Sequence, residues 1–190
     1  MERIVECVPN FSEGRNEGII KEITDTIEAV AGVKLLDVDP GADTNRTVVT
    51  MVGSPQNVAE AVFQAVKRAA QLIDMRQHRG AHPRFGATDV VPFVPVSGVT
   101  MDDCVKLAGQ VGKRIGEDLG IPVYLYEHAA SRPERRNLSR VRTGEYEGLA
   151  EKLADDEWQP DFGPSTFNAE AGATAVGARE FLIAYNIDLN

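Results

Sequence analysis

RTVVTMVGSPQNVAEAVFQAVKRAA, residues 46–70, is the stretch that decides the fold. Its first part, 46–52, is rich in β-branched residues and predicts a strand. Ser54 follows as a helix N-cap with Pro55 at the first helical position. Behind them, apolar residues recur at helical spacing: Val58, Val62, Ala65, Val66 and Ala69. The stretch therefore predicts a strand that passes directly into an amphipathic helix, which we expect to reach about Asp74.

The same alternation continues on both sides of this stretch. The pattern predicts, in chain order, a strand at 3–8, a helix over 19–30, a strand at 33–38, the strand and helix above, a strand at 90–94, a helix from the capping-box-like Thr100-Met101-Asp102-Asp103 to Leu119-Gly120, and a strand at 123–126. The first six elements read βαββαβ, the split βαβ order of ferredoxin-like folds. The last two extend the sheet. We expect an α/β (α+β) protein with a ferredoxin-like core, extended to a mixed sheet with helices on one face.

The remainder of the chain is less regular. Residues 127–167 are richer in Arg, Glu, Gly and Pro, with a helix expected at 146–155, and a last strand is expected from about Ala175 to Ile187. No internal repeat or linker divides the chain, so we expect a single domain over 1–190. Helices on one face leave the other sheet face uncovered, and an apolar sheet face of this size needs a second layer. Another chain, a second copy or a further domain should supply it.

Composition excludes several classes of protein. The 190 residues are 43% hydrophobic and carry a net charge of −9, which argues against a protein that coats nucleic acid or an anionic membrane. The two cysteines, Cys7 and Cys104, are far apart and lack metal or redox spacing. Neither a leader sequence nor a membrane-spanning segment is recognisable, so a cytoplasmic location is expected.

Two of the three histidines fall in one loop, RQHRGAHPRFG, residues 76–86. Loops held by a scaffold often carry catalytic groups, and histidine suits proton transfer near neutral pH. A solvated polar loop without function is the alternative. A metal site at His78 and His82 is disfavoured, because the glycine between them and Pro83 after them oppose a helix, and no H-E-x-x-H pattern is present. We therefore expect no metal.

Arginines gather in this otherwise acidic chain. Arg76, Arg79 and Arg84 flank the two histidines, and a second group lies at Arg132, Arg135, Arg136, Arg140 and Arg142. Local basic density favours a small carboxylate or phosphate ligand. For the second group, a solvated face with salt bridges to Glu134 and Glu145 explains the pattern equally well.

A turn-rich segment, 161–172, contains two aromatic residues, Phe162 and Phe167, which suit a flat heterocycle or simply anchor the loop. Phosphate-binding P-loops, dinucleotide fingerprints and nucleophile elbows are absent from the sequence. From the residues alone, the prediction is a histidine-centred site for an anionic ligand.

Several longer motifs carry a resemblance that goes further. These are VECVPNFSEG (5–14), LIDM (72–75) followed by His82-Pro83-Arg84, VYLY (123–126), GEYE (144–147), DFGP (161–164) and FLIAYN (181–186). Together they resemble the N-terminal subdomain of glutamate formiminotransferase, over essentially the whole chain. That family transfers a formimino group from N-formimino-L-glutamate to N5 of tetrahydrofolate in histidine breakdown.

The resemblance also implies site residues. His82 matches the family's catalytic histidine, which would take the proton from N5 and return one to the departing glutamate amine. Asp39 matches an active-site aspartate that would orient His82 or stabilise a cationic amidine, and Arg84 is expected to bind substrate. The folate-binding segment corresponds to Gly163, Pro164, Ser165, Thr166, Phe167, Asn168, Ala169, Glu170, Ala171 and Gly172. Glu170 departs from the residue often found in the family there.

The family's transferase continues into a C-terminal subdomain beyond the position of Asn190, and folate lies between the two halves. This chain is expected to supply one wall, with tetrahydrofolate as co-substrate. It would be one subunit of a split enzyme, a piece of a longer one, or a stand-alone homologue. The partner would be a C-terminal-subdomain chain or another copy of this chain. The alternative function is a folate-binding or interaction module without turnover; a nucleic-acid-binding ferredoxin-like domain is disfavoured by the charge.

Overall fold

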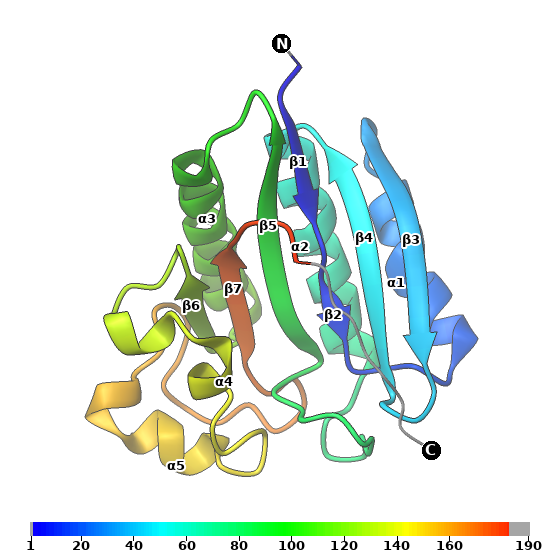
Figure 1. Cartoon of the computed structure of the whole chain (residues 1–190). Coiled ribbons are helices and arrows are strands. Elements are labelled where there is room, and N and C mark those ends of the chain that lie inside the picture. Colours follow the sequence, from blue (N-terminus) through cyan, green and yellow to red (C-terminus); the bar gives the residue numbers. More distant parts are fainter. Residues whose placement is uncertain (1, 183–190) are drawn as a thin grey trace, which may run out of the picture.

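The computed structural model describes residues 2–182 and shows one mixed sheet with helices packed behind it (Figure 1). The strands are β1 (Ile4–Cys7), β2 (Asn10–Phe11), β3 (Val33–Gly41), β4 (Arg46–Gly53), β5 (Thr88–Ser97), β6 (Val123–Glu127) and β7 (Thr174–Ala178). The helices are α1 (Glu17–Glu28), α2 (Pro55–Leu72), α3 (Met101–Leu119), α4 (Leu138–Val141) and α5 (Leu149–Ala154), with 3-10 turns η1 (Pro133–Arg135) and η2 (Asp156–Trp158).

The strand order confirms the predicted mixed sheet. β1 and β2 lie end to end between β4 and β5, and β3 pairs with the other side of β4, all antiparallel. β7 then pairs parallel with both β5 and β6. The βαββαβ order of the core is present as expected, and α3 with β6 extends it.

Local capping explains why α2 and α3 begin where the sequence predicted and why α1 begins at Glu17, two residues before the predicted range. The Ser54 side chain accepts from the backbone of Asn57, and Thr100 with Asp103 forms a complete capping box. Asn16 caps α1 in the same way. At the other end of α3, Gly120 takes the left-handed conformation, with φ of 64°.

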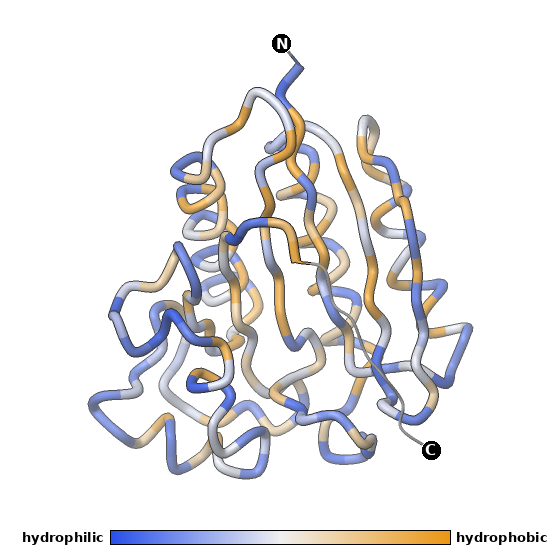
Figure 2. Tube along the Cα trace, in the orientation of Figure 1, coloured by the Kyte–Doolittle hydropathy of each residue, from blue (hydrophilic) through white to orange (hydrophobic). Residues whose placement is uncertain are grey.

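The core lies between the helices and one face of the sheet. Figure 2 shows apolar residues running along the inner strands and the facing sides of the helices. In β4, Val49 and Met51 are buried toward α1 and α2, whereas Val48 and Thr50 face the other side and are half-buried. Figure 1 shows the three long helices, α1, α2 and α3, together on one side of the sheet, as predicted. The short helix α4 packs against β6 on the opposite side, and no helix of the described chain covers that side over β3 and β4.

Four details differ from expectation. The chain resumes sheet pairing after Pro9 as β2, because the backbone beyond the proline again pairs with β4 and β5. The irregular region holds two short helices, and α5 begins at Leu149 rather than Tyr146 because residues 143–147 form turns. η1 and η2 were not foreseen. The last strand ends at Ala178; the part of its expected range from 183 onward lies outside the described residues.

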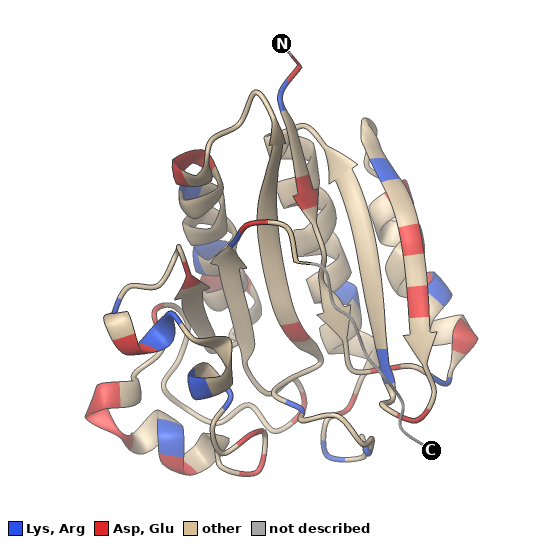
Figure 3. Ribbon diagram, viewed as in Figure 1, with Lys and Arg blue, Asp and Glu red and all other residues tan. Residues whose placement is uncertain are grey.

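Charged residues are unevenly distributed over the molecule. Figure 3 shows few charged residues on the inner strands and many around the lower end of the sheet and on the α4–α5 region. None of the helices that the structure describes has the length and apolarity needed to cross a bilayer.

Candidate active site

The histidine loop, residues 76–86, joins α2 to β5 at the end of the sheet where β4 and β5 begin (Figure 1). It is fastened to the β3–β4 turn, where the Ala81 amide donates to the Asp43 carbonyl at 3.0 Å. Gly80 lies so close to this turn that a Cβ would stand 2.1 Å from the Thr44 carbonyl oxygen, so only glycine fits. This contact brings His82 to the first residue of β4.

Hydrogen bonds fix the tautomer of His82. Its Nδ1 lies 2.5 Å from the carbonyl oxygen of Pro83. A carbonyl oxygen only accepts, so Nδ1 carries the proton and Nε2 keeps the lone pair. Nη1 of Arg46 lies within hydrogen-bond distance of both ring nitrogens, 3.1 Å from Nδ1 and closer to Nε2, and with Nδ1 protonated only Nε2 can accept from it. The basic nitrogen of the imidazole therefore faces the Arg46 guanidinium.

The surroundings also set the protonation state of His82. Burial lowers its pKa below the ordinary value of 6.5, and the charge of Arg46 lowers that pKa further. The Pro83 carbonyl and Asp89 act in the opposite direction without cancelling the effect, while Arg142 adds to it. His82 is therefore neutral near neutral pH, which is the form that accepts a proton.

A buried carboxylate holds the guanidinium in place. Asp89, whose side chain is only 2% exposed, pairs with Nη2 of Arg46 at 3.3 Å. The same carboxylate accepts from Arg142, from Nε at 3.1 Å and also from Nη2. Nη2 of Arg46 donates in addition to the Asn10 side chain at 2.5 Å. One negative charge thus serves two positive ones, and the group carries a net charge of +1 with His82 neutral.

Sequence reasoning missed most of this network. Arg142 was noted only as one of an arginine group, and Arg46, Asp89 and Asn10 were not singled out. One signal was available: Asp89 interrupts the apolar strand that begins at Thr88, and a carboxylate inside a buried strand requires charged partners. The partners themselves come from distant parts of the chain, so sequence spacing did not reveal them.

Two hollows of about 300 Å³ each open beside His82. The first is also lined by Arg79, Arg84 and Glu147, and the second by Ser139, Arg142 and Thr143, among others. His82 and Glu145 line both. Their size is at the lower end of the range for small-molecule sites.

His78 has a different environment from His82. It is buried, and Nε2 donates to the Asn45 carbonyl oxygen at 2.8 Å. Burial lowers its pKa as well. Its ring fastens the histidine loop to the β3–β4 turn and does not line either hollow.

Arg84 lies between the first hollow and the protein interior. Its Nη1 donates to the Met75 carbonyl at 3.1 Å and to that of His78. Nε and Nη2 pair with Glu147, and the guanidinium stacks 4.8 Å from the centre of the Tyr146 ring. Most donors of this arginine are therefore already used within the chain.

The predicted folate segment, 163–172, wraps around the same end of the sheet. Its Phe167 ring is 39% exposed and packs 5.3 Å from the Tyr146 ring, centre to centre. The Tyr146 hydroxyl donates to the Ala169 carbonyl at 2.6 Å. At Glu170 the segment meets the histidine loop, since its carboxylate pairs with Arg76 at 3.1 Å and its carbonyl accepts from the amide of Met75, directly before the loop, at 2.9 Å. The segment is adjacent to the histidine loop through Tyr146, but within the described chain it does not line either hollow.

Asp39 lies on the edge strand β3, opposite Val48 of β4. Val48 also pairs with Asn10 on its other side, so Asp39 shares the open sheet face with the Arg46 network. Arg46 is its diagonal neighbour, about 7–8 Å away between Cα atoms. No hydrogen bond or ion pair joins Asp39 to His82 or to any other described side chain. Of the two roles suggested by the resemblance, orientation of His82 finds no contact here.

Two arginines of the second group form ion pairs with different aspartates. Arg135 is buried and pairs with Asp161 at 2.8 Å, and Arg142 belongs to the Asp89 network. The expected salt bridges to Glu134 and Glu145 are not formed among the described residues.

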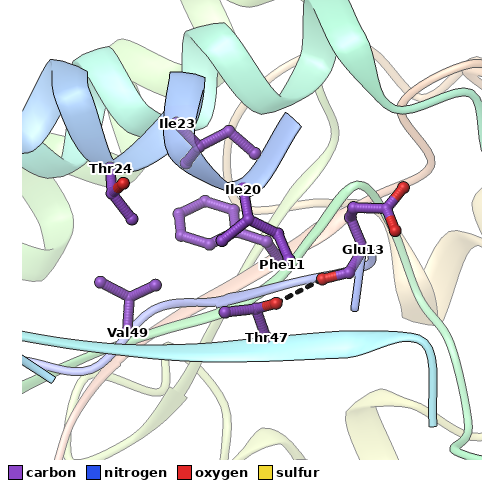
Figure 4. A pocket seen from close by; sticks show the side chains of 7 residues that line it. All are labelled: Phe11, Glu13, Ile20, Ile23, Thr24, Thr47 and Val49. Carbon is purple, nitrogen blue, oxygen red and sulfur yellow. Dashed lines mark hydrogen bonds between the residues drawn. The ribbon is translucent and has the colours of Figure 1, made fainter. Parts of the chain in front are cut away.

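Two further kinds of site, a cavity beside α1 and a metal centre, find no support in the described residues. A gap between α1 and the sheet, lined by Phe11, Ile20, Ile23 and neighbours, is too tight for a water molecule (Figure 4). There the Thr47 hydroxyl donates to the Glu13 carbonyl, while the Glu13 carboxylate points away. Within residues 2–182, His, Cys, Asp and Glu side chains form no group of three suited to a metal ion.

Comparison with known proteins places this site in a family context. The model of the formiminotransferase domain, N-terminal subdomain, matches residues 4–179. Formimidoyltransferase-cyclodeaminase from Rattus norvegicus is 56% identical over 189 residues, covering 100% of this chain and 35% of the relative.

Two shorter relatives show similar identity. Glutamate formimidoyltransferase from Streptococcus pyogenes serotype M1 is 50% identical over 100% of this chain and 64% of the relative. The protein of the same name from Thermoplasma acidophilum is 52% identical over 98% of this chain and 62% of the relative. The chain thus spans about a third of the fused protein and just under two thirds of the shorter ones.

Proposed function

The chain belongs to the family of formiminotransferase N-terminal subdomains, and we propose that it contributes the catalytic half of an enzyme that transfers a formimino group from N-formimino-L-glutamate to tetrahydrofolate. The observation that carries this proposal is the neutral His82, fixed in one tautomer beside the Arg46–Asp89 network. The names of the relatives support the transferase activity.

In the proposed reaction His82 acts first as base and then as acid. N5 of the folate bonds to the formimino carbon while its proton passes to Nε2 of His82. The bond between that carbon and the glutamate nitrogen then breaks, and the proton moves from His82 to the departing amine. The products are 5-formiminotetrahydrofolate and glutamate. Arg46 must release Nε2 for the first step, so the incoming N5–H replaces the Arg46 N–H there.

Folate is proposed to lie along the 163–172 segment. The exposed face of Phe167, supported by Tyr146, offers a stacking surface for the flat pteridine. The contact of Glu170 with Arg76 of the histidine loop would then keep the ring system close to His82. Asp39 and Arg84 are proposed as further substrate contacts at the rim, Asp39 from the open sheet face and Arg84 from the first hollow.

A second half of the enzyme is part of the proposal. The relatives are longer than this chain, and the open face of the sheet beside Asp39 has no helical layer in the described part. We propose that a C-terminal subdomain, on a separate chain or in continuation of this one, covers that face and forms the other wall of the folate site.

The direct test is transferase activity with N-formimino-L-glutamate and tetrahydrofolate, first for the chain alone and then with the polypeptide encoded beside it. Activity in either case supports the proposal, and activity only with the second polypeptide establishes a split enzyme. Folate binding without activity in both cases would instead make the chain a binding module.

A further inference from the structure

We propose that the second hollow, between Arg142 and Glu145, binds the formimino donor, with a donor carboxylate on Arg142 and the cationic amidine on Glu145. The inference rests on the proposed function and deepens it, because it assigns the residue that distinguishes a formimino donor from a formyl donor. His82 lines the same hollow as both charged groups.

Arg142 retains free hydrogen-bonding capacity toward this hollow. Its Nε and Nη2 are used by Asp89, whereas Nη1 makes no hydrogen bond to any described residue. Its side chain is 17% exposed and lines the hollow with His82. Because Asp89 is shared with Arg46, its single charge leaves the pair of guanidinium groups one positive charge in excess. A carboxylate is the ligand that matches this geometry and charge.

Glu145 supplies the opposite charge. It is exposed, lines both hollows beside His82, and forms no ion pair with any described residue despite the arginines around it. Its backbone lies in the left-handed region, with φ of 54°, which is unfavourable for a residue with a side chain. The Glu145 amide donates to the Arg142 carbonyl at 2.7 Å, so one tight turn presents both charged groups.

Other acids near His82 are less suited to the amidine. Glu147 is already paired with Arg84, and Asp39 lies on the edge strand and lines neither hollow. Asp89 is buried and saturated by two arginines. Within the described chain, Glu145 is therefore the unpaired carboxylate at the hollows beside His82.

The chemistry of the donor fits this arrangement. A formimino group on nitrogen is an amidine, which is a planar cation with N–H donors near neutral pH, whereas the corresponding formyl group is a neutral amide. An unpaired carboxylate stabilises the former by a charge-assisted hydrogen bond and offers much less to the latter. Glu145 is thus a specificity residue, whereas Arg142 binds the carboxylate that both donors have.

The test is isothermal titration calorimetry on the full chain with N-formimino-L-glutamate and with N-formyl-L-glutamate. The native chain should bind the formimino compound more tightly. Glu145→Gln should weaken its binding roughly tenfold or more and leave the formyl compound nearly unchanged. Glu151→Gln, at an exposed glutamate on α5 away from both hollows, is the matched control and should change neither.

Arg142→Gln should weaken both compounds, with Arg140→Gln as its exposed control. The subsite is overturned if the native chain binds neither compound, if it binds them equally, or if Asp39→Asn rather than Glu145→Gln removes the preference. Transferase activity separates the two proposals. Normal turnover with an indifferent Glu145→Gln variant rejects the subsite alone, while selective donor binding without any transfer rejects the proposed function alone.

Discussion

His78 and His82 are four residues apart in one loop, and their surroundings give them different roles. His78 is buried, and the hydrogen bond of its ring to the Asn45 carbonyl fastens the loop. His82 is partly open, lines both hollows and faces Arg46 with its unprotonated nitrogen. Their spacing in the sequence does not show which histidine suits catalysis, whereas their different burial in the structure does.

Replacing each histidine should therefore affect a different property. His82→Ala should lower turnover by about a hundredfold or more, because no other group takes the N5 proton. His78→Ala should cost roughly 1–3 kcal/mol of unfolding free energy and change turnover far less. Steady-state kinetics and urea unfolding on both variants make the comparison. Near-normal kcat in His82→Ala would reject the acid/base assignment, and equal losses of activity would revive a paired role.

Arg46 should set the pH range of activity. Its charge contributes to the lowered pKa of His82, and His82 must be neutral to accept a proton. The rate should fall as the pH drops through that pKa. In Arg46→Gln the pKa should rise, so the acidic limb of kcat/KM should move to higher pH, while Arg46→Lys should leave it nearly in place. The other charged groups that act on the pKa of His82 are Asp89 and Arg142, which both variants retain. An acidic limb that is identical in all three proteins would exclude this role.

The site was predictable from sequence only in part. His82 stood out because glycine and proline surround it in a loop, which is a local property. The Arg46–Asp89–Arg142 network depends on two strands and an irregular segment that meet only in the folded chain. No local sequence pattern predicts that these three side chains come together. The carboxylate of Asp89 within a buried strand is the only local indication of the network.

At the scale of elements, α3 and the predicted folate segment are in direct contact. Gly116 of α3 lies against the backbone at Phe162 and Gly163, where an added Cβ would stand 2.5 Å from the Gly163 nitrogen. The helix can approach the segment this closely only because the side chain is absent.

Gly116→Ala should therefore disturb the segment. We expect a loss of about 1–3 kcal/mol in unfolding free energy from overpacking, together with weaker folate binding. Gly109→Ala on the same helix is the control, since a Cβ there meets nothing within 4 Å. That variant should gain roughly 0.5–1 kcal/mol from helix propensity. Thermal unfolding and fluorescence titration with folate provide the two readouts, and indistinguishable variants would refute the close contact.

Lys152 of α5 joins that helix to the turn that carries Arg142. Its ammonium donates to the carbonyls of Val141 at 2.5 Å and Thr143 at 2.9 Å and lies 4.2 Å from the Trp158 ring centre. Burial lowers its pKa from 10.5 to about 8. Between these values the unfolded chain binds more protons than the folded one, so stability contributed at this residue increases with pH.

The expected result is a pH-dependent difference between the native chain and Lys152→Met. The free energy of unfolding of the native chain, minus that of the variant, should rise between about pH 8 and pH 10.5. Chemical denaturation across this window measures it. A constant difference would mean that the ammonium keeps an ordinary pKa.

The helices and long strands were predictable because capping residues and periodicity are local signals. Ser54, Thr100 and Gly120 mark helix ends that the structure confirms. α5 was predicted within 146–155, whereas β2 and α4 were not, since a two-residue strand and a single helical turn depend on the neighbours they pair with.

At the scale of the whole molecule, the three long helices lie on one side of the sheet, and the other side has no helix of the described chain over β3 and β4. If a second subdomain covers the other side, light scattering should show a larger complex when the chain is mixed with the polypeptide encoded beside it, or an oligomer of the chain alone. A Val48→Asp substitution on the open face should reduce that mass, whereas Lys34→Asp, near the far end of β3, should do so less. A monomer under all conditions would argue against a second layer.

The position of β7 has a consequence for biosynthesis. This strand lies between β5 and β6 although it is the last of the described strands to be synthesised, so the two parts of the sheet are joined by residues 174–178. On the ribosome, β5 and β6 must wait with unpaired edges until those residues leave the exit tunnel. Unpaired strand edges are sites of aggregation, and sheets closed by distant segments form slowly. The emerging chain should therefore depend on chaperones until β7 is inserted.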